Sequence, residues 1–365
     1  MSESTHTMNP ETQILFMLLR AGLQVGNGSS EQLPEYIKDS QWKNIYRMAS
    51  RHGILGIVWD GIRRLSAESR IPRQLRLNWA YNTEIIGQRY ARQKKTAEEL
   101  AALFAEEEIR MLIFKGLSMS TYYPVPEHRE CGDVDIWLFG RAEQGNRVAE
   151  AAGATVEEEN SKHDIIHFLG IPFENHKELT TELLNRRNRS LNAELRSRVA
   201  DAPLKSLFGT GAPYTPDKAF YELYIPIHAA EHFVTGGISL RHICDWALLV
   251  QANGGHVEME LFDKVKLGQF VRLLDSLCKE WFGIETEPEC LHPDERLVAR
   301  FGKDILHYGC SPTTTSRWKL LQLKFRRFFS RKWCYPIVGG NLYLSAMRSA
   351  IAHLISPKDF FKGNQ

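Results

Sequence analysis

Residues 132–138 read Gly-Asp-Val-Asp-Ile-Trp-Leu, in which polar and apolar side chains alternate as they do along a β-strand. A strand places alternate side chains on opposite faces, so Asp133 and Asp135 share one face, and Val134, Ile136 and Leu138 share the other. Two carboxylates about 7 Å apart repel each other unless a cation lies between them. Hard divalent ions such as Mg²⁺ prefer carboxylate oxygens and leave positions open for phosphate. The stretch therefore predicts a strand with one buried face, whose other face is either a metal site or simply solvated.

The segments around this strand predict a small mixed sheet. Upstream, residues 111–114 read Met-Leu-Ile-Phe, a short apolar strand that ends at Lys115 and Gly116, and a short helix over 117–122 is expected next. Downstream, residues 141–152 predict a helix closed by a glycine. Three further short strands are expected at residues 154–158, 164–169 and 171–176. The succession of strands and helices indicates that they form one mixed sheet.

Helical patterns lie on both sides of the sheet segment. Residues 74–108 predict one long helix or two nearly collinear ones, because they contain no proline and no glycine cluster. Residues 216–233 and 240–251 are the clearest helices after the sheet. We therefore predict an α+β fold with a helical N-terminal region, a small mixed-sheet core and a helical C-terminal region, at residues 1–104, 105–180 and 181–365.

The composition is that of an average globular protein, with 365 residues, 43% of them hydrophobic and 25% charged, which excludes wholesale disorder and a collagen-like repeat. The sequence contains no window of 18 uninterrupted apolar residues, so no transmembrane helix is expected. The first ten residues lack the pattern of a secretory signal. The six cysteines are far apart and form no Cys-x-x-Cys pair, which argues against a disulfide framework and a cysteine-rich zinc site. We expect a cytoplasmic protein with reduced thiols.

The turn at Lys115 and Gly116 is a candidate phosphate site. A strand that runs into glycine at the start of a helix presents backbone N–H groups, and the lysine adds positive charge. Gly116 precedes Asp133 by 17 residues, enough for one helix and a loop, so the phosphate site can lie beside the two aspartates. An ordinary strand-to-helix turn would have the same sequence pattern.

A third carboxylate is predicted on the last of the expected strands. If Phe173 faces inward there, Glu174 and His176 lie together on the other face. On a neighbouring strand, Glu174 would complete a two-metal site and could accept the proton of an attacking hydroxyl group. Asp164 and residues 157–159 are rival carboxylates, which we interpret mainly as surface charge.

Together these residues resemble the signature of the uncharacterised nucleotidyltransferase family, within the DNA polymerase β-like superfamily. That superfamily has a glycine turn, then a strand with two carboxylates, then a third carboxylate on a later strand. The resemblance covers about residues 100–250 and includes a later helical pattern. The residues that carry it are Lys115, Gly116, Tyr123, Pro124, Arg129 and 132–136, followed by His228, His232, Arg241 and Asp245.

By this resemblance Asp133 and Asp135 would carry the metal ions, Mg²⁺ or Mn²⁺, and Glu174 would match the third carboxylate. The implied activity is a metal-dependent transfer of a nucleoside monophosphate from a nucleoside triphosphate (NTP) to an acceptor. That acceptor could be a small molecule, a sugar phosphate, a protein side chain or an RNA end. Two alternatives are a DxD glycosyltransferase that uses a nucleotide-sugar and a non-catalytic nucleotide-binding or scaffold protein of the same fold. The first is disfavoured because the apolar run follows the aspartates here, whereas in such enzymes it usually precedes them.

By the same resemblance Gly116 and Ser118 would hold the triphosphate. The Gly-Ser turn of the superfamily is Gly-Leu-Ser in this chain, and Lys115 precedes it. We therefore expect Lys115 or Arg129 to take over part of the phosphate binding. Arg129 has the alternative role of neutralising the carboxylates when no metal is bound.

His228 and His232 lie four residues apart, on one face of a predicted helix. Zinc proteases use this spacing, but in their HExxH motif the glutamate follows the first histidine, whereas Glu231 precedes the second one here. No further ligand is evident in the sequence, which argues against such a site. His232, Arg241 and Asp245 are expected to pair with one another or to line the site.

The net charge of +2 conceals a basic C-terminal end, since residues 305–358 contain no acidic side chain. On a helix over residues 317–333, aromatic side chains would share one broad face, and arginine and lysine side chains an adjacent one. Such a helix could lie on an anionic membrane surface or bind a polyanion such as RNA. The alternative that we favour is a terminal helix whose aromatic side chains pack on the acidic body of the protein.

Overall fold

The N-terminal part of the chain is helical, as predicted. Helix α1 crosses α3 so closely that both need glycine there: a Cβ on Gly22 would lie 2.2 Å from the carbonyl oxygen of Ile57, and one on Gly61 would lie 1.9 Å from that of Leu18. The helices of this part are α1 (Pro10–Leu23), α2 (Asp39–Arg51), α3 (Leu55–Arg64) and α4 (Arg73–Glu106). The computed structural model describes residues 8–158, 163–180, 186–201, 204–209, 211–286, 293–309 and 329–340.

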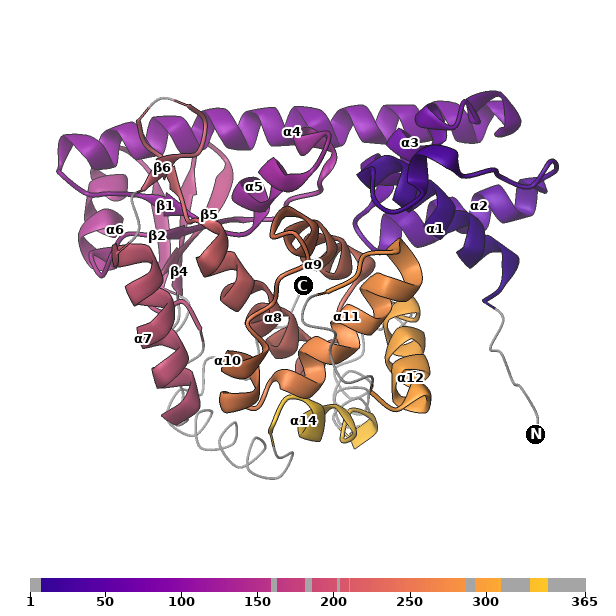
Figure 1. Ribbon diagram of the computed structural model, residues 1–365. Coiled ribbons are helices and arrows are strands. Elements are labelled where there is room, and N and C mark those ends of the chain that lie inside the picture. The colour runs from indigo at the N-terminus through magenta and orange to yellow at the C-terminus, as the bar shows by residue number, and fades with distance from the viewer. Residues whose placement is uncertain are drawn as a thin grey trace.

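Helix α4 is one continuous helix of 34 residues. At 1.5 Å per residue it is about 50 Å long, and Figure 1 shows it lying across the N-terminal helices at one end and the sheet at the other. Near its start, Trp79 Nε1 donates a hydrogen bond to the carbonyl oxygen of Leu55 at 3.0 Å. Towards its end, Ala97, Leu100 and Phe104 are buried in a core that they share with the sheet. The helix therefore joins the N-terminal helices to the sheet.

Within the described residues the sheet has seven strands, in the order β3-β4-β5-β2-β1-β7-β6. Strand β2 is antiparallel to β1 and parallel to β5, so the sheet is mixed, as predicted. The first five strands lie where the sequence predicted strands, whereas β6 and β7 come from beyond residue 180 and are too short to show an alternating pattern. The strands are β1 (Leu112–Ile113), β2 (Val134–Trp137), β3 (Thr155–Glu158), β4 (His163–Phe168), β5 (Ile171–His176), β6 (Lys205–Ser206) and β7 (Tyr214–Thr215).

Helices cover both faces of the sheet. The apolar residues of β2, such as Val134, are buried in the same core as α4, with α6 (Ala142–Ala151) alongside. The opposite face is turned towards α8 (Lys218–Thr235), where the rings of Phe114 and Tyr224 meet edge to face with centroids 5.4 Å apart. The aspartates of β2 belong to this second face, in agreement with the predicted alternation.

The C-terminal part is again helical and shares a core with the N-terminal helices. Phe16 of α1, for example, stacks on Trp281 of α11 with ring centroids 4.7 Å apart. Helices α8 and α9 coincide with the two helices that the sequence predicted most clearly. After the short α5 (Gly116–Met119), the helices are α7 (Arg186–Asp201), α8, α9 (Leu240–Ala252), α10 (Met259–Lys264), α11 (Gly268–Phe282), α12 (Glu295–Leu306) and α14 (Cys334–Ile337).

Most of the predicted basic helix lies outside the described residues, which resume at residue 329. Arg331 is 7% exposed, its guanidinium lies 2.9 and 3.1 Å from the carboxylate oxygens of Asp304, and its Nε donates to the carbonyl oxygen of Phe233 at 2.7 Å. The ring of Trp333 packs against the edge of Phe233 with centroids 5.4 Å apart. Arg331 and Trp333 therefore pack on the body of the protein. Contact of the predicted helix with a membrane or a polyanion stays a prediction.

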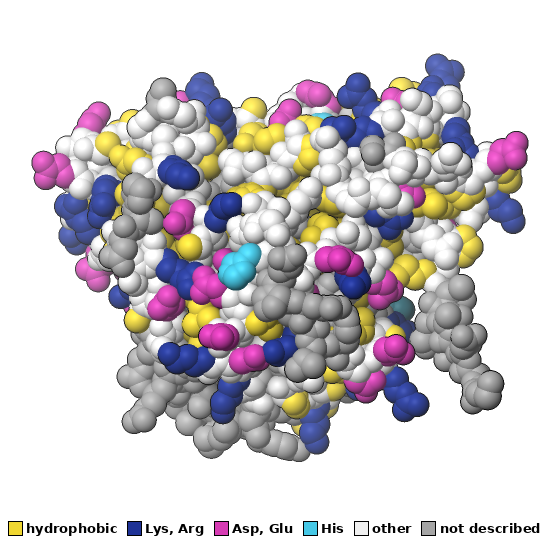
Figure 2. Space-filling view, viewed as in Figure 1, with side chains coloured by type: hydrophobic (Ala, Val, Ile, Leu, Met, Phe, Trp, Pro, Cys, Tyr) yellow, Lys and Arg dark blue, Asp and Glu magenta, His cyan; other side chains and the backbone are white. Residues whose placement is uncertain are grey.

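The described surface is mixed in charge. Figure 2 shows acidic and basic side chains side by side over much of the visible face. Among the described residues, no helix is long and apolar enough to cross a membrane.

Candidate active site

Two neighbouring strands bring three carboxylates together on the face of the sheet that is turned towards α8. Asp135 on β2 is directly opposite Glu174 on β5 in the parallel register. Asp133 lies just before β2, and its side chain forms a hydrogen bond with that of Glu174. Two ionised carboxylates cannot form such a bond, so it exists while Asp133 is protonated, below a pH of about 6. We call Asp133, Asp135 and Glu174 the carboxylate site.

Lysine and histidine side chains contact this site. Lys115 Nζ forms an ion pair with Asp135 Oδ1. His176 Nε2 lies 2.9 Å from the same oxygen and 3.2 Å from Glu174 Oε2. His163, on the adjacent strand β4, has its Nδ1 4.0 Å from Glu174 Oε2. The expectation that Glu174 and His176 share a face agrees with these distances, and the structure adds His163 to them.

The pKa values show that negative charge is in excess here. Burial of its carboxyl group and the neighbouring Glu174 raise the pKa of Asp133 to about 6. Burial acts to raise the pKa of Glu174 too, but the hydrogen bond from His176 and the charge of Lys115 hold it well below its usual value. Burial acts to lower the pKa of Lys115, but the charges of Asp135 and Glu174 raise it above its usual value. The site therefore holds a proton on Asp133 below about pH 6, and at neutral pH the Lys115 ammonium offsets part of its negative charge.

Lys115 has a strained backbone. Its φ of 63° and ψ of −151° fall in a region that is populated almost only by glycine, and such strain costs roughly 1–3 kcal/mol. This backbone directs the side chain over the site, with Nζ 5.6 Å from the ring centroid of Phe114 and 5.9 Å from that of Tyr224. Strained residues of this kind cluster at ligand-binding sites. The sequence singled out the lysine but not its conformation, because glycine was expected to make the turn.

Ser118 is placed differently from the expectation that it holds a triphosphate. Its side chain is fully buried, and its hydroxyl forms hydrogen bonds with Tyr221 of α8 and Thr215 of β7. These bonds hold α5 against its neighbours. The structure thus gives Ser118 a packing role, because its hydroxyl is both enclosed and already bonded within the protein.

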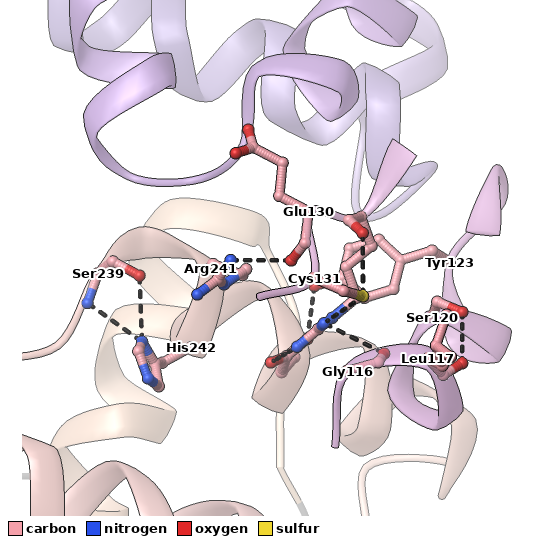
Figure 3. Close-up of polar contacts among 11 residues, drawn as sticks. Gly116, Leu117, Ser120, Tyr123, Glu130, Cys131, Ser239, Arg241 and His242 are labelled. Atoms are coloured by element: carbon pink, nitrogen blue, oxygen red, sulfur yellow. Dashed lines mark hydrogen bonds and ion pairs between the residues drawn. The ribbon is translucent and has the colours of Figure 1, made fainter. Parts of the chain in front are cut away.

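Arg129 lies in neither of its two expected places. Its Nε and Nη2 donate to the two carboxylate oxygens of Asp245 at 2.8 and 2.7 Å, and Tyr123 Oη donates to the same carboxylate at 2.7 Å. The third nitrogen, Nη1, donates to the carbonyl oxygen of Gly116 at 3.2 Å. Figure 3 shows the polar contacts between Gly116 and the segment that contains Tyr123 and Cys131. We call Arg129, Asp245 and Tyr123 the arginine clamp, because its arginine binds both Asp245 and the backbone of the Gly116 turn.

The clamp is a buried ion pair. Burial acts to raise the pKa of Asp245, but Arg129 and the hydroxyl of Tyr123 hold it below its usual value. Asp245 is thus paired with Arg129, a partner that the sequence did not suggest. Arg241 instead donates to the carbonyl oxygen of Glu130 at 2.8 Å.

Asp164 is buried, so the expectation that it is surface charge is wrong. It is 1% exposed, and its carboxylate accepts hydrogen bonds from Lys177 Nζ and Asn146 Nδ2, both at 2.8 Å. Strand alternation explains this, because Asp164 shares a face with the buried Ile166, whereas His163 faces Glu174. Glu157 has a largely exposed side chain, as expected. The structure therefore leaves Glu174 as the carboxylate beside the two aspartates.

One family of known proteins is similar to the chain. The sequence model of a family described as "Uncharacterised nucleotidyltransferase" matches residues 38–283, well over half of the chain. That range contains the carboxylate site, Lys115 and the arginine clamp. No curated protein and no solved structure matches the chain.

Proposed function

The chain belongs to the uncharacterised nucleotidyltransferase family, and from this we propose that its carboxylate site transfers a nucleoside monophosphate from an NTP to an acceptor with the help of a divalent metal ion. The observation that carries the proposal is the convergence of Asp133, Asp135 and Glu174 on one face of the sheet. Structural ion pairs balance their charges, whereas this group keeps an excess of carboxylates. Excess negative charge that reaches solvent at Asp133 suits a cation-dependent reaction.

The side chains of the site fit a hard divalent ion. Asp133, Asp135 and Glu174 supply the carboxylate oxygens that Mg²⁺ or Mn²⁺ prefers, and Lys115 already offsets part of their mutual repulsion. When bound, such an ion neutralises charge on the triphosphate and stabilises the attacking and leaving oxygens. His176 donates to Asp135 and Glu174 and keeps both carboxylates in position.

Lys115 is the residue that we assign to the triphosphate. Its ammonium lies in the site on a strained turn, whereas Arg129 is committed to Asp245 and Ser118 is buried. In the absence of substrate the ammonium offsets the charge of Asp135, and with substrate it binds a phosphate oxygen. This contact needs only a rotation of a long side chain, because the backbone already directs Lys115 to the site.

The proton of the acceptor is assigned to the hydrogen-bonded pair of Asp133 and Glu174. In the metal-free protein, burial and the neighbouring Glu174 raise the pKa of Asp133 to about 6. The pair is therefore placed to take up a proton from an attacking hydroxyl group. The acceptor carries such a hydroxyl in each of the expected classes: a small molecule, a sugar phosphate, a protein side chain or an RNA end.

The proposal is tested with NTPs that carry a radioactive label on either the α- or the γ-phosphate. The full chain is incubated with each labelled NTP, Mg²⁺ or Mn²⁺ and a cell extract, which is then separated into protein, RNA and small molecules. We expect metal-dependent transfer of the α-label to one fraction, and its loss in Asp133→Asn/Asp135→Asn. Asp263→Asn, which changes an exposed ion pair with Arg272, is the control and should transfer as the wild type does. Transfer of the γ-label alone, or of a sugar from a nucleotide-sugar, would contradict the proposal.

A further inference from the structure

A second cluster of ionisable side chains lies between α8 and α9. His228 and His232 are one helical turn apart on α8, and His242 joins them from the first turn of α9. One ligand atom from each histidine can be chosen so that all three lie within 4.8 Å of one another. Their ring centroids are 4.5, 5.5 and 6.0 Å apart. The third histidine, which the sequence did not reveal, is thus supplied by the next helix.

The environment of the cluster keeps His242 in the form that binds metals. Burial, together with the neighbouring His232 and Arg241, lowers the pKa of His242 to about 3. His242 is therefore a neutral imidazole at physiological pH, as a metal ligand must be. The guanidinium of Arg241 is directed elsewhere, because it donates to the carbonyl oxygen of Glu130. At the other end of the cluster, the ring of His228 stacks on Tyr224 with centroids 5.7 Å apart.

The orientation of His242 is fixed by the start of its helix. Its Nδ1 lies 3.1 Å from Ser239 Oγ and 3.2 Å from the backbone nitrogen of Ser239, and Figure 3 shows both contacts. Nε2 is therefore the nitrogen that would bind an ion. The backbone N–H of Ser239 donates to Nδ1 in the metal-free protein, so binding through Nε2 would move the imidazole hydrogen to Nδ1, which would then donate it to Ser239 Oγ.

We propose that His228, His232 and His242 bind one Zn²⁺ ion at a site separate from the carboxylate site. Three imidazole nitrogens suit zinc and similar borderline ions, whereas the carboxylate site offers the oxygens that suit Mg²⁺. His232 is exposed, so an ion can enter from solvent. Both helices are rigid supports: α8 carries Tyr224 next to Lys115, and α9 carries Asp245 of the arginine clamp. The ion fastens these two helices together beside the proposed active site.

The test is a metal titration of the full chain after removal of metals with a chelator. Co²⁺ replaces zinc and absorbs visible light when histidines bind it, and Zn²⁺ is then added to displace it. With excess Mg²⁺ present to occupy the carboxylate site, we expect one Co²⁺ or Zn²⁺ ion per chain, whose affinity falls about tenfold or more in His232→Gln and in His242→Gln. Two control variants should bind as the wild type does: His256→Gln, an exposed histidine outside the cluster, and His163→Gln, which alters the histidines beside Glu174.

Each other outcome overturns the proposal. Affinities within twofold of the wild type in both His232→Gln and His242→Gln would show that the cluster does not bind the ion. An equal loss in His256→Gln would indicate scattered surface binding, and a loss in His163→Gln with none in His232→Gln would place the ion at the carboxylate site. Thermal unfolding of each variant without metal shows whether it folds. If His242→Gln does not fold, the exposed His232 decides the result alone.

Discussion

The carboxylate site and the arginine clamp both adjoin the Gly116 turn, through Lys115 and Arg129, and both combine aspartate with a basic side chain. In the clamp, one carboxylate faces one guanidinium through two hydrogen bonds, and the side chains of Arg129 and Asp245 are 6% and 8% exposed. In the carboxylate site, the described residues place three carboxylates around the single ammonium of Lys115. The clamp is thus balanced in charge, and the carboxylate site is not.

This difference separates a structural ion pair from a candidate site of chemistry. In the clamp the pKa of Asp245 is held low by its partners, so both charges persist without any ligand. At the carboxylate site the pKa of Asp133 is raised to about 6, because its carboxyl group is partly buried and its neighbours are also acidic. A site whose negative charge is not balanced within the protein is a candidate for binding a cation.

The largest expected effect is on catalysis. Asp135→Asn removes a carboxylate from the site, and we expect the transfer rate to fall by at least about 10³-fold, since metal ions supply several kcal/mol to such reactions. The rate is measured with α-labelled NTP under saturating metal. The free energy of unfolding should change little by comparison, because the replaced charge was part of an excess. A variant that keeps more than a tenth of the wild-type rate would remove Asp135 from the mechanism.

The clamp should respond in the opposite way. Asp245→Asn leaves the guanidinium of Arg129 buried without a charged partner, which typically costs about 3–5 kcal/mol of stability. Chemical denaturation measures this loss. The matched control is Asp263→Asn, whose ion pair with Arg272 is largely exposed and should cost less than about 1 kcal/mol. Equal losses in the two variants would mean that the clamp contributes no more than a surface pair.

The next prediction concerns Lys115, which we assign to the triphosphate, whereas Arg129 is paired with Asp245. Lys115→Met removes the ammonium that we assign to the triphosphate, and a charged hydrogen bond contributes about 1.5–3 kcal/mol. The KM for the NTP should therefore rise roughly 10- to 100-fold. Steady-state kinetics at fixed metal concentration measure this rise, and thermal unfolding checks that the variant is folded. An unchanged KM would transfer the phosphate contact to another residue.

The smallest expected effect is on the pH dependence of stability. Because the pKa of Asp133 is about 6 in the folded protein and 3.8 in a model peptide, the folded state binds the proton more tightly. Ionisation of Asp133 therefore lowers stability as the pH rises through 6, and Asp133→Asn removes this loss. Without metal, we expect the variant to gain about 1–3 °C in Tm over the wild type at pH 8 and less at pH 5. A gain that is larger at pH 5 would show that the pKa of Asp133 is not raised.

The sequence predicted those parts of the site that follow from strand alternation. The faces of Asp133, Asp135, Glu174 and His176 could be read from a period of two, and the parallel pairing of β2 with β5 then brought the carboxylates together. Asp164 was misassigned although the same rule applies to it. Asp164 lies two residues before the apolar Ile166 and so shares its face, but the prediction gave more weight to the general tendency of aspartate to be exposed.

Contacts between distant segments could not be predicted in this way. Arg129 and Asp245 are 116 residues apart, and no local pattern marks two charges as partners. The same holds for His242, which meets His228 and His232 only because α8 and α9 fold back on each other. The burial of Ser118 likewise depends on packing against later elements. Local periodicity thus predicted faces and strands, whereas the identity of long-range partners required the fold.

The central claim, that the carboxylate site binds an NTP together with a metal ion, is tested most directly by thermal unfolding of the full chain. Each of the four NTPs is added with and without Mg²⁺ or Mn²⁺, to the wild type and to Asp133→Asn/Asp135→Asn. A ligand at 100 times its Kd stabilises the folded state by about 2.7 kcal/mol, so binding raises the Tm visibly. We predict a rise that needs both NTP and metal and that is absent from the double variant. A rise that persists in the double variant, or the lack of any rise in the wild type, would contradict the account.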